Sequence, residues 1–191
     1  MALQEKIFTA GTVGGEEYNE YALRLTVTED AVSETSNSST VSFKLQLLSG
    51  DYRFEMFGLG AEVKLNGTRV AYRNRDSEPQ VSMGFWSTLE ILSGTAEIPH
   101  NPDGSLDMAV EFSISMAAYS YTPGPISVTG ETMTLTQIAR ASTIAASAAN
   151  IEETSVVTVS RKNTGYTHSI RCKFGSVSGY LTSVEATYSK P

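Results

Sequence analysis

The stretch "LDMAVEFSISM" (Leu106–Met116) decides the fold, because every second residue in it is large and apolar. On a strand, six side chains would share one face: Leu106, Met108, Val110, Phe112, Ile114 and Met116. Alternation with a period of two is typical of a half-buried β-strand and does not match the 3.6-residue period of a helix. The stretch therefore predicts a long strand with one face on a hydrophobic core.

Similar alternation occurs on both sides of this strand, in "YALRLTVTE" (21–29), "TVSFKLQLL" (40–48), "VSMGF" (81–85), "TLEILSGTAEI" (88–98) and "ISVTGETMTLT" (126–136). Asn66-Gly67 in "AEVKLNGTRVAY" predicts a two-residue type I′ hairpin turn that sets Val63 opposite Val70. By parity the apolar residues before and after Gly130 face opposite ways, which predicts a β-bulge at this glycine.

The polar stretch "EDAVSETSNSST" (29–40) contains almost no large apolar residues and predicts a surface loop. Asn37 and Asn66 each begin an N-x-[ST] sequon. Because no secretory signal is recognisable, we interpret both as turn residues rather than glycosylation sites.

At least eight short strands, separated by turns rich in Gly, Asn, Asp and Pro, predict an all-β fold. We expect an antiparallel, jelly-roll-like β-sandwich over residues 1–137, with "QIARAS" (137–142) as the link to a small β module over residues 138–191. This module has three or four predicted strands, fewer than the roughly seven of an Ig-like sandwich. We therefore expect an Ig-like module that is truncated or is completed by a neighbouring subunit.

The net charge of −7 is unevenly distributed. Residues 1–137 carry 18 acidic and 8 basic side chains, and residues 138–191 carry 3 acidic and 6 basic ones. An acidic surface repels phosphate backbones, so we expect no nucleic-acid binding. The basic residues Arg171 and Lys173 alternate along a predicted strand and fit a solvated face better than a binding patch.

Several other classes of protein are excluded by composition. No apolar run reaches the roughly 20 residues that span a bilayer, so no membrane insertion is expected. The N-terminus lacks the basic and apolar regions of a signal peptide, which predicts synthesis in a cytoplasm. A single cysteine, Cys172, excludes an internal disulfide framework and a cysteine cluster for zinc.

His100 and Asp103, in "IPHNPDGS", raise the question of a hydrolytic site with Ser105 or another serine as nucleophile. Such a site needs a base that is held on the nucleophile and oriented by a third group, and no G-x-S-x-G signature accompanies these residues. Pro99 and Pro102 restrain the segment, and Pro-Asp-Gly is a turn sequence. We interpret it as a hairpin connector with a polar turn histidine.

The sequence gives little support for a metal site or for a catalytic pair of carboxylates. Zinc at His168 would lack ligands, because Cys172 lies four residues along a strand, about 13 Å away. The acidic pairs Glu16-Glu17 and Glu152-Glu153 could serve calcium binding or glycoside hydrolysis. No calcium-loop motif is present, so solvated loops are the better interpretation. We expect no metal, no cofactor and no enzymatic activity.

Aromatic side chains are the candidates for ligand binding, because neutral sugars are held by exposed rings and a few polar groups. Trp86 falls out of phase with the apolar residues of "VSMGF", so its ring is expected to point outward. The other candidates lie near strand ends or in loops: Tyr52, Tyr72, Tyr119 and Tyr121.

Several motifs, in the same order, resemble a family of minor structural proteins of long-tailed bacteriophages (siphoviruses) whose function is unknown. They are the "LNGT" hairpin, the "HNPDG" connector before the alternating strand, "LTQIARAS" after the next strand, and the downstream "YTHSIRCKFG". The resemblance covers most of residues 20–180. It implies structural rather than catalytic roles for the matching residues Asn66, Gly67, His100, Asn101, Asp103 and Gly104. Pro99, Pro102 and the end at Pro191 depart from the pattern.

The resemblance implies a tail or tail-tip protein of the virion that contacts the host surface. We expect a non-enzymatic homo-oligomer, for which a trimer is one closed arrangement. The expected partners are other tail proteins and a bacterial surface polysaccharide, a neutral one because the body is acidic. Two alternatives stay open: a purely architectural head-fibre, decoration or baseplate protein, and a glycan-degrading tail enzyme.

Overall fold

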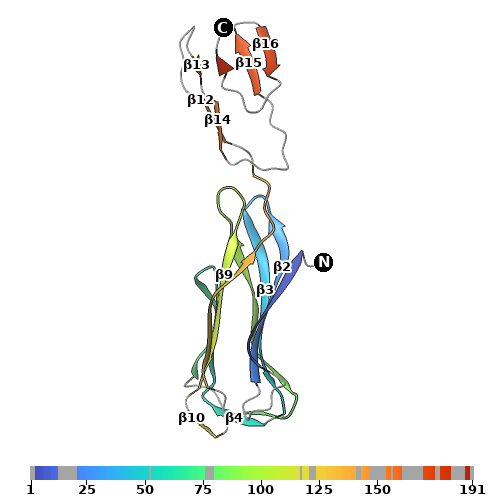
Figure 1. Cartoon of the computed structure of the whole chain (residues 1–191), viewed down its shortest axis with the longest axis vertical. Coiled ribbons are helices and arrows are strands. Elements are labelled where there is room, and N and C mark those ends of the chain that lie inside the picture. The colour runs from blue at the N-terminus through green and yellow to red at the C-terminus, as the bar shows by residue number, and fades with distance from the viewer. Residues whose placement is uncertain are drawn as a thin grey trace. The chain divides into compact units, whose positions relative to one another are not determined.

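The computed structural model describes residues 3–12, 21–51, 53–75, 80–116, 118–120, 124–140, 143–146, 154–155, 157–160, 170–174, 177–181 and 188–189 (Figure 1). The chain divides into two compact units, one of residues 1–101 and 105–138 and one of residues 102–104 and 139–191. Among the described residues no helix is long and apolar enough to cross a membrane.

The strands of the first unit follow one another in chain order. They are β1 (Gln4–Thr12), β2 (Tyr21–Ser33), β3 (Ser38–Ser49), β4 (Phe54–Phe57), β5 (Gly60–Leu65), β6 (Thr68–Arg73), β7 (Val81–Met83), β8 (Thr88–Pro99), β9 (Asp107–Ser115), β10 (Ala118–Ser120) and β11 (Ile126–Thr134).

Two four-stranded antiparallel sheets form the layers of this unit, in the orders β1-β2-β3-β8 and β11-β9-β5-β6 (Figure 1). The rings of Phe8 on β1 and Phe112 on β9 meet in the core, with their centroids 6.5 Å apart. A third sheet, β10-β4-β7, lies at one end. The predicted all-β antiparallel sandwich is confirmed, and its jelly-roll and Ig-like details stay predictions.

The alternating stretch that decides the fold forms β9, which pairs with β5 on one side and β11 on the other. Its inward residues are at most 2% exposed: Met108, Val110, Phe112 and Ile114. Leu106, just before the strand, is also buried, and Met116 packs partly against the same core. Each fully buried side chain of this size contributes about 1.5–3 kcal/mol, so this strand alone anchors much of the core.

The β5–β6 turn has the predicted residues, since Asn66 and Gly67 have φ angles of 50° and 77°. The predicted register beyond it is wrong, because Val63 lies opposite Ala71 and not opposite Val70. A shift in pairing between Val63 and Lys64 leaves Val70 as the extra residue, and both Val70 and Ala71 then pack against the core.

The predicted bulge at Gly130 is confirmed. The pairing of β11 with β9 shifts between Val128 and Glu131, and Gly130 has a φ of 80°. The extra residue changes the phase of the strand, so Ile126 and Val128 before the bulge and Met133 beyond it all pack on one core.

The predicted surface loop over residues 29–40 is wrong. Strand β2 continues to Ser33 and β3 begins at Ser38, which leaves only residues 34–37 for the turn. Glu29 and Ser39 occupy inward positions and are 0% exposed. The alternation was hidden in the sequence because polar side chains take these inward positions.

The second unit contains three described antiparallel strand pairs. Strand β12 (Thr143–Ala146) pairs with β14 (Val157–Ser160), β13 (Thr154–Ser155) pairs with β17 (Tyr188–Ser189), and β15 (Ile170–Phe174) pairs with β16 (Val177–Leu181).

Candidate functional site

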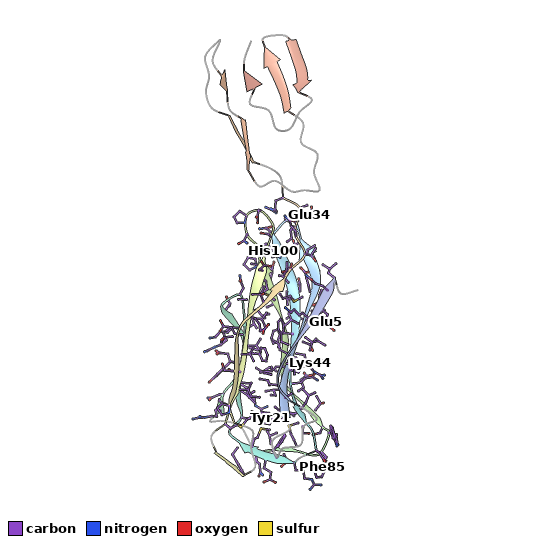
Figure 2. The ribbon with its side chains drawn as sticks, in the orientation of Figure 1. Glu5, Tyr21, Glu34, Lys44, Phe85 and His100 are labelled. Carbon is purple, nitrogen blue, oxygen red and sulfur yellow. The ribbon has the colours of Figure 1, made fainter. Side chains whose placement is uncertain are left out.

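The sheet β10-β4-β7 and the turn after β7 form what we call the aromatic end of the sandwich, where Phe85 is labelled in Figure 2. Three large rings are exposed here: Trp86 at 65%, Phe85 at 53% and Phe57 at 40%. The strand "VSMGF" ends at Met83, two residues earlier than predicted, so Phe85 leaves the core-facing row and joins Trp86 at the surface.

Hydrogen bonds fix the turn that carries these rings. The Trp86 N–H donates to the Gly50 carbonyl (2.8 Å), and the Ser49 hydroxyl donates to the Gly84 carbonyl (2.6 Å). The Ser87 N–H donates back to the Ser49 hydroxyl (2.9 Å). The turn that carries the exposed rings is therefore fixed to Ser49 and Gly50.

Trp86 adopts a left-handed backbone conformation, with a φ of 47°. This region costs an L-residue about 1–2 kcal/mol and is rare for bulky side chains. Strain of this kind persists only where the surroundings impose it, and it is concentrated at functional sites. A strained and exposed tryptophan adds little to stability, which directs attention to contact with a ligand or partner.

Polar groups accompany the rings of the aromatic end. The guanidinium of Arg53 lies 5.2 Å from the centroid of the Phe85 ring. Glu55 and Ser82 pair across β4 and β7, and both are exposed. The surface thus combines apolar rings with a hydrogen-bond donor, an acceptor and a hydroxyl.

The structure brings only some of the predicted aromatic candidates together. Tyr119 lies on β10, in the same sheet as the aromatic end, where it pairs with Met56; its side chain is outside the described residues. Tyr72, 55% exposed, lies on β6 in a different sheet, with the Arg69 guanidinium 4.8 Å from its ring centroid. Tyr52 and Tyr121 also lie outside the described residues.

At the other end of this unit, where Figure 2 labels His100, buried polar side chains form what we call the polar end. The Ser39 hydroxyl donates to the Glu29 carboxylate (2.6 Å) and lies 2.7 Å from Nε2 of His100. Glu29 also accepts hydrogen bonds from the backbone N–H (3.0 Å) and hydroxyl (2.7 Å) of Thr136 and from the side chain of Gln4 (2.7 Å). One carboxylate therefore ties together β1, β3 and the segment after β11.

Burial alone raises the pKa of the Glu29 carboxyl, but the hydrogen bonds outweigh this effect. Donation from Ser39, Thr136 and Gln4 favours the ionised form and holds the pKa below its ordinary value. The carboxylate is thus charged at neutral pH although it is buried. Sequence reasoning missed Glu29 and Ser39, and the only available signal was their position in phase with Leu25 and Val41.

The network at the polar end has the residue types of a hydrolase triad, but its hydrogen bonds run in the wrong direction. Because the Ser39 proton points to Glu29, Nε2 of His100 must donate to the Ser39 oxygen and cannot act as its base. Ser39 is also 0% exposed, so a substrate could not reach it. These residues stabilise the fold and do not form a nucleophilic site.

The segment around His100 differs from the predicted hairpin connector. It joins β8 in one sheet to β9 in the other, so it crosses between the layers. His100 is buried (8% exposed) and is not an exposed turn residue, whereas Asp103 is exposed.

Asn37, which begins a predicted turn sequon, holds this connector. Its side-chain amide donates to the backbone carbonyls of His100 (3.1 Å) and Asn101 (2.9 Å), and its backbone carbonyl accepts from the His100 N–H (2.8 Å). Its φ of 54° confirms the turn assignment.

No group of three or more potential metal ligands occurs among the described residues. Cys172 lies on β15 opposite Gly179. His168, Glu16-Glu17 and Glu152-Glu153 fall outside the described part of the chain.

Comparison with known proteins identifies a family. No curated protein and no solved structure matches the chain. A family described as "Siphovirus protein of unknown function" (DUF859) matches residues 14–190, a range that contains the aromatic end and also Glu29, Ser39 and His100 of the polar end. Membership indicates a structural protein of a bacteriophage, associated with the virion. The chain thus belongs to this family of siphovirus proteins, as the order of its motifs predicts.

Proposed function

We propose that this protein is a tail or tail-tip component of a siphovirus virion and that its aromatic end adheres to a glycan on the host surface. The observation that carries the proposal is Trp86, which is 65% exposed in a strained backbone conformation and fixed by hydrogen bonds to the body. Neither the exposure nor the strain contributes to folding, so contact with another molecule is the better explanation for both.

A neutral glycan fits the chemistry of this end. Sugar rings pack on aromatic faces such as Trp86 and Phe85, and their hydroxyls can bond to Arg53, Glu55 and Ser82. The acidic body, with 18 acidic and 8 basic residues in 1–137, favours an uncharged polymer at long range. Tyr119 on β10 belongs to the same sheet and is a further candidate.

We further propose that the protein is not an enzyme and acts as a homo-oligomer, for example a trimer, assembled with other tail proteins. The single contact surface of each copy is small, and several copies on one virion would raise the avidity without any new contact. The direction of the hydrogen bonds among Glu29, Ser39 and His100 supports a non-catalytic role for this triad-like cluster.

The test is adsorption of the full-length protein to host cells and to an array of bacterial surface polysaccharides. We expect Trp86→Ala and Phe85→Ala to reduce binding by about tenfold or more, as for an aromatic contact at the centre of an interface. Val32→Ala is the matched control, because Val32 is an exposed apolar residue (38%) on β2, away from the aromatic end.

Two outcomes would contradict the proposal. Equal binding by wild type and Trp86→Ala would remove the aromatic end from adhesion. Absence of binding by the assembled oligomer to any host polysaccharide would favour the architectural alternative, in which the exposed rings pack on a neighbouring virion protein. Antibody labelling of virions would place the protein on the tail or on the head.

A further inference from the structure

The outer face of the β1-β2-β3-β8 sheet carries an open groove of about 640 Å³. Short hydroxyl side chains are part of its lining. Thr28, Ser42 and Thr95 lie opposite one another on β2, β3 and β8, with Thr26 two residues along β2 from Thr28. Longer side chains line it as well, and Figure 2 shows two of them, Glu5 and Lys44, on this side of the unit. The groove is therefore a hydroxyl-rich surface that is open to solvent.

Two cations lie side by side in this groove. Arg24 on β2 pairs with Gln46 on β3, and Lys44 is two residues from Gln46 on the same strand. Diagonal neighbours of this kind have Cα atoms about 7–8 Å apart, which is within the joint reach of two long side chains. Arg24 and Lys44 can thus contact one ligand group together.

These two cations are only weakly neutralised by the protein. The Arg24 guanidinium donates to Gln46, which is uncharged (3.0 Å). Lys44 has Glu90 at 3.9 Å, and both side chains are about half exposed (52% and 47%), so this ion pair contributes little. Among the described residues that line the groove, Glu5 is the one anionic side chain, and it accepts a hydrogen bond from Thr28.

The outer face of the opposite sheet has the contrasting arrangement. There Lys64 lies 3.6 Å from Glu62 and 3.7 Å from Glu111, and Arg69 pairs with Glu62 as well. The cations of that face are already neutralised by carboxylates. Among the described residues, the groove face differs in that its hydroxyls adjoin two cations that are only weakly paired with carboxylates.

We propose that this groove binds a phosphate-bearing polyol chain of the host surface. Its two weakly paired cations attract an anion at short range, although the net charge of the unit repels one at long range. A phosphate directs its oxygens in several directions and can accept hydrogen bonds from Arg24 and Lys44 at once. The hydroxyls of a flexible polyol chain can form hydrogen bonds with the threonine and serine hydroxyls that line the groove. The described lining offers sugar rings no aromatic stacking surface, because Phe43, its one aromatic residue, is buried (4% exposed).

This proposal does not depend on adhesion by the aromatic end. The salt dependence of binding distinguishes the two proposals. Binding of short poly(glycerol phosphate) chains to the full-length protein is measured in the presence of a chelator, which prevents bridging by divalent cations. Raising the salt from about 50 mM to about 500 mM should weaken this binding, since exposed charges are screened. Neutral glycan binding at Trp86 should change little.

We expect the double substitution Arg24→Gln with Lys44→Gln to reduce poly(glycerol phosphate) binding by about tenfold or more, from the loss of two charge-assisted hydrogen bonds. Arg24→Lys should retain part of the binding because it keeps the charge. Lys64→Gln is the matched control, since it removes a cation from the opposite sheet. Thermal unfolding of each variant verifies that it is folded.

Several results would overturn the proposal. They are failure of the wild type to bind poly(glycerol phosphate), equal binding by the double variant, or an equal loss in Lys64→Gln. Equally tight binding of a uronic-acid polysaccharide would show that the groove recognises a carboxylate or charge in general. Equally tight binding of uncharged glycerol oligomers would remove the role of the phosphate.

Discussion

The two ends of the sandwich invert the usual distribution of side chains in opposite ways. At the polar end a carboxylate, a serine and a histidine are buried, and at the aromatic end phenylalanine and tryptophan rings are exposed. Burial of Glu29 is tolerated because Ser39, Thr136 and Gln4 supply hydrogen bonds to its oxygens. The described residues show no such compensation for the exposure of Trp86. The contrast indicates that one end maintains the fold and the other is available for contact.

The largest expected effect is loss of stability when Glu29 is replaced by alanine. The donors of Ser39, Thr136 and Gln4 would lose a buried acceptor, and we expect a decrease of about 3 kcal/mol or more in the free energy of unfolding. Urea unfolding measures it. Glu5→Ala is the matched control on the neighbouring strand, because Glu5 is exposed. A similar cost for both variants would contradict the special role of the polar end.

Acid should reduce the stability that Glu29 at the polar end contributes. The pKa of Glu29 is lowered in the folded protein, so the stability that its charge contributes is complete above the ordinary carboxyl pKa of about 4.3. This contribution is lost as the pH falls through the lower pKa of the folded state. The stability difference between wild type and Glu29→Gln should therefore shrink as the pH falls below about 4.3. A difference that stays constant over this range would contradict the prediction.

His100→Ala should have a smaller effect. It removes one hydrogen bond to Ser39 and some buried contact, for which we expect a loss of about 1–2 kcal/mol. Adhesion should be unchanged, because His100 lies at the end opposite to Trp86. Chemical unfolding and adsorption are measured together, and a folded variant that no longer adheres would overturn the structural role of His100.

The smallest expected effect on stability comes from Trp86→Gly. Glycine accepts the left-handed φ of 47° without strain, and this gain is offset in part by the greater freedom of the unfolded chain. We expect the free energy of unfolding to rise or to stay within about 1 kcal/mol of wild type. Adhesion should nevertheless be lost. Strong destabilisation would show that the ring supports the fold after all.

The sandwich could be predicted from local pattern alone, because its strands alternate strictly where their inward residues are apolar. The strand β9, the Asn66-Gly67 turn and the Gly130 bulge follow from rules that involve only neighbouring residues. The same rules failed at residues 29–40, where Glu29 and Ser39 take inward positions. Their burial depends on Thr136, 107 residues from Glu29, and no local pattern contains that partner.

The sequence by itself therefore determined the fold class, the family resemblance and the outward direction of Trp86, since each depends on short-range order or on the order of motifs. Only the tertiary structure decided that His100 is buried and that Phe85 joins Trp86 at the surface. It also decided that Arg24 and Lys44 share one groove. Hydrogen bonding and charge act between atoms that are close in space, and strand pairing brings together residues that are far apart in the chain.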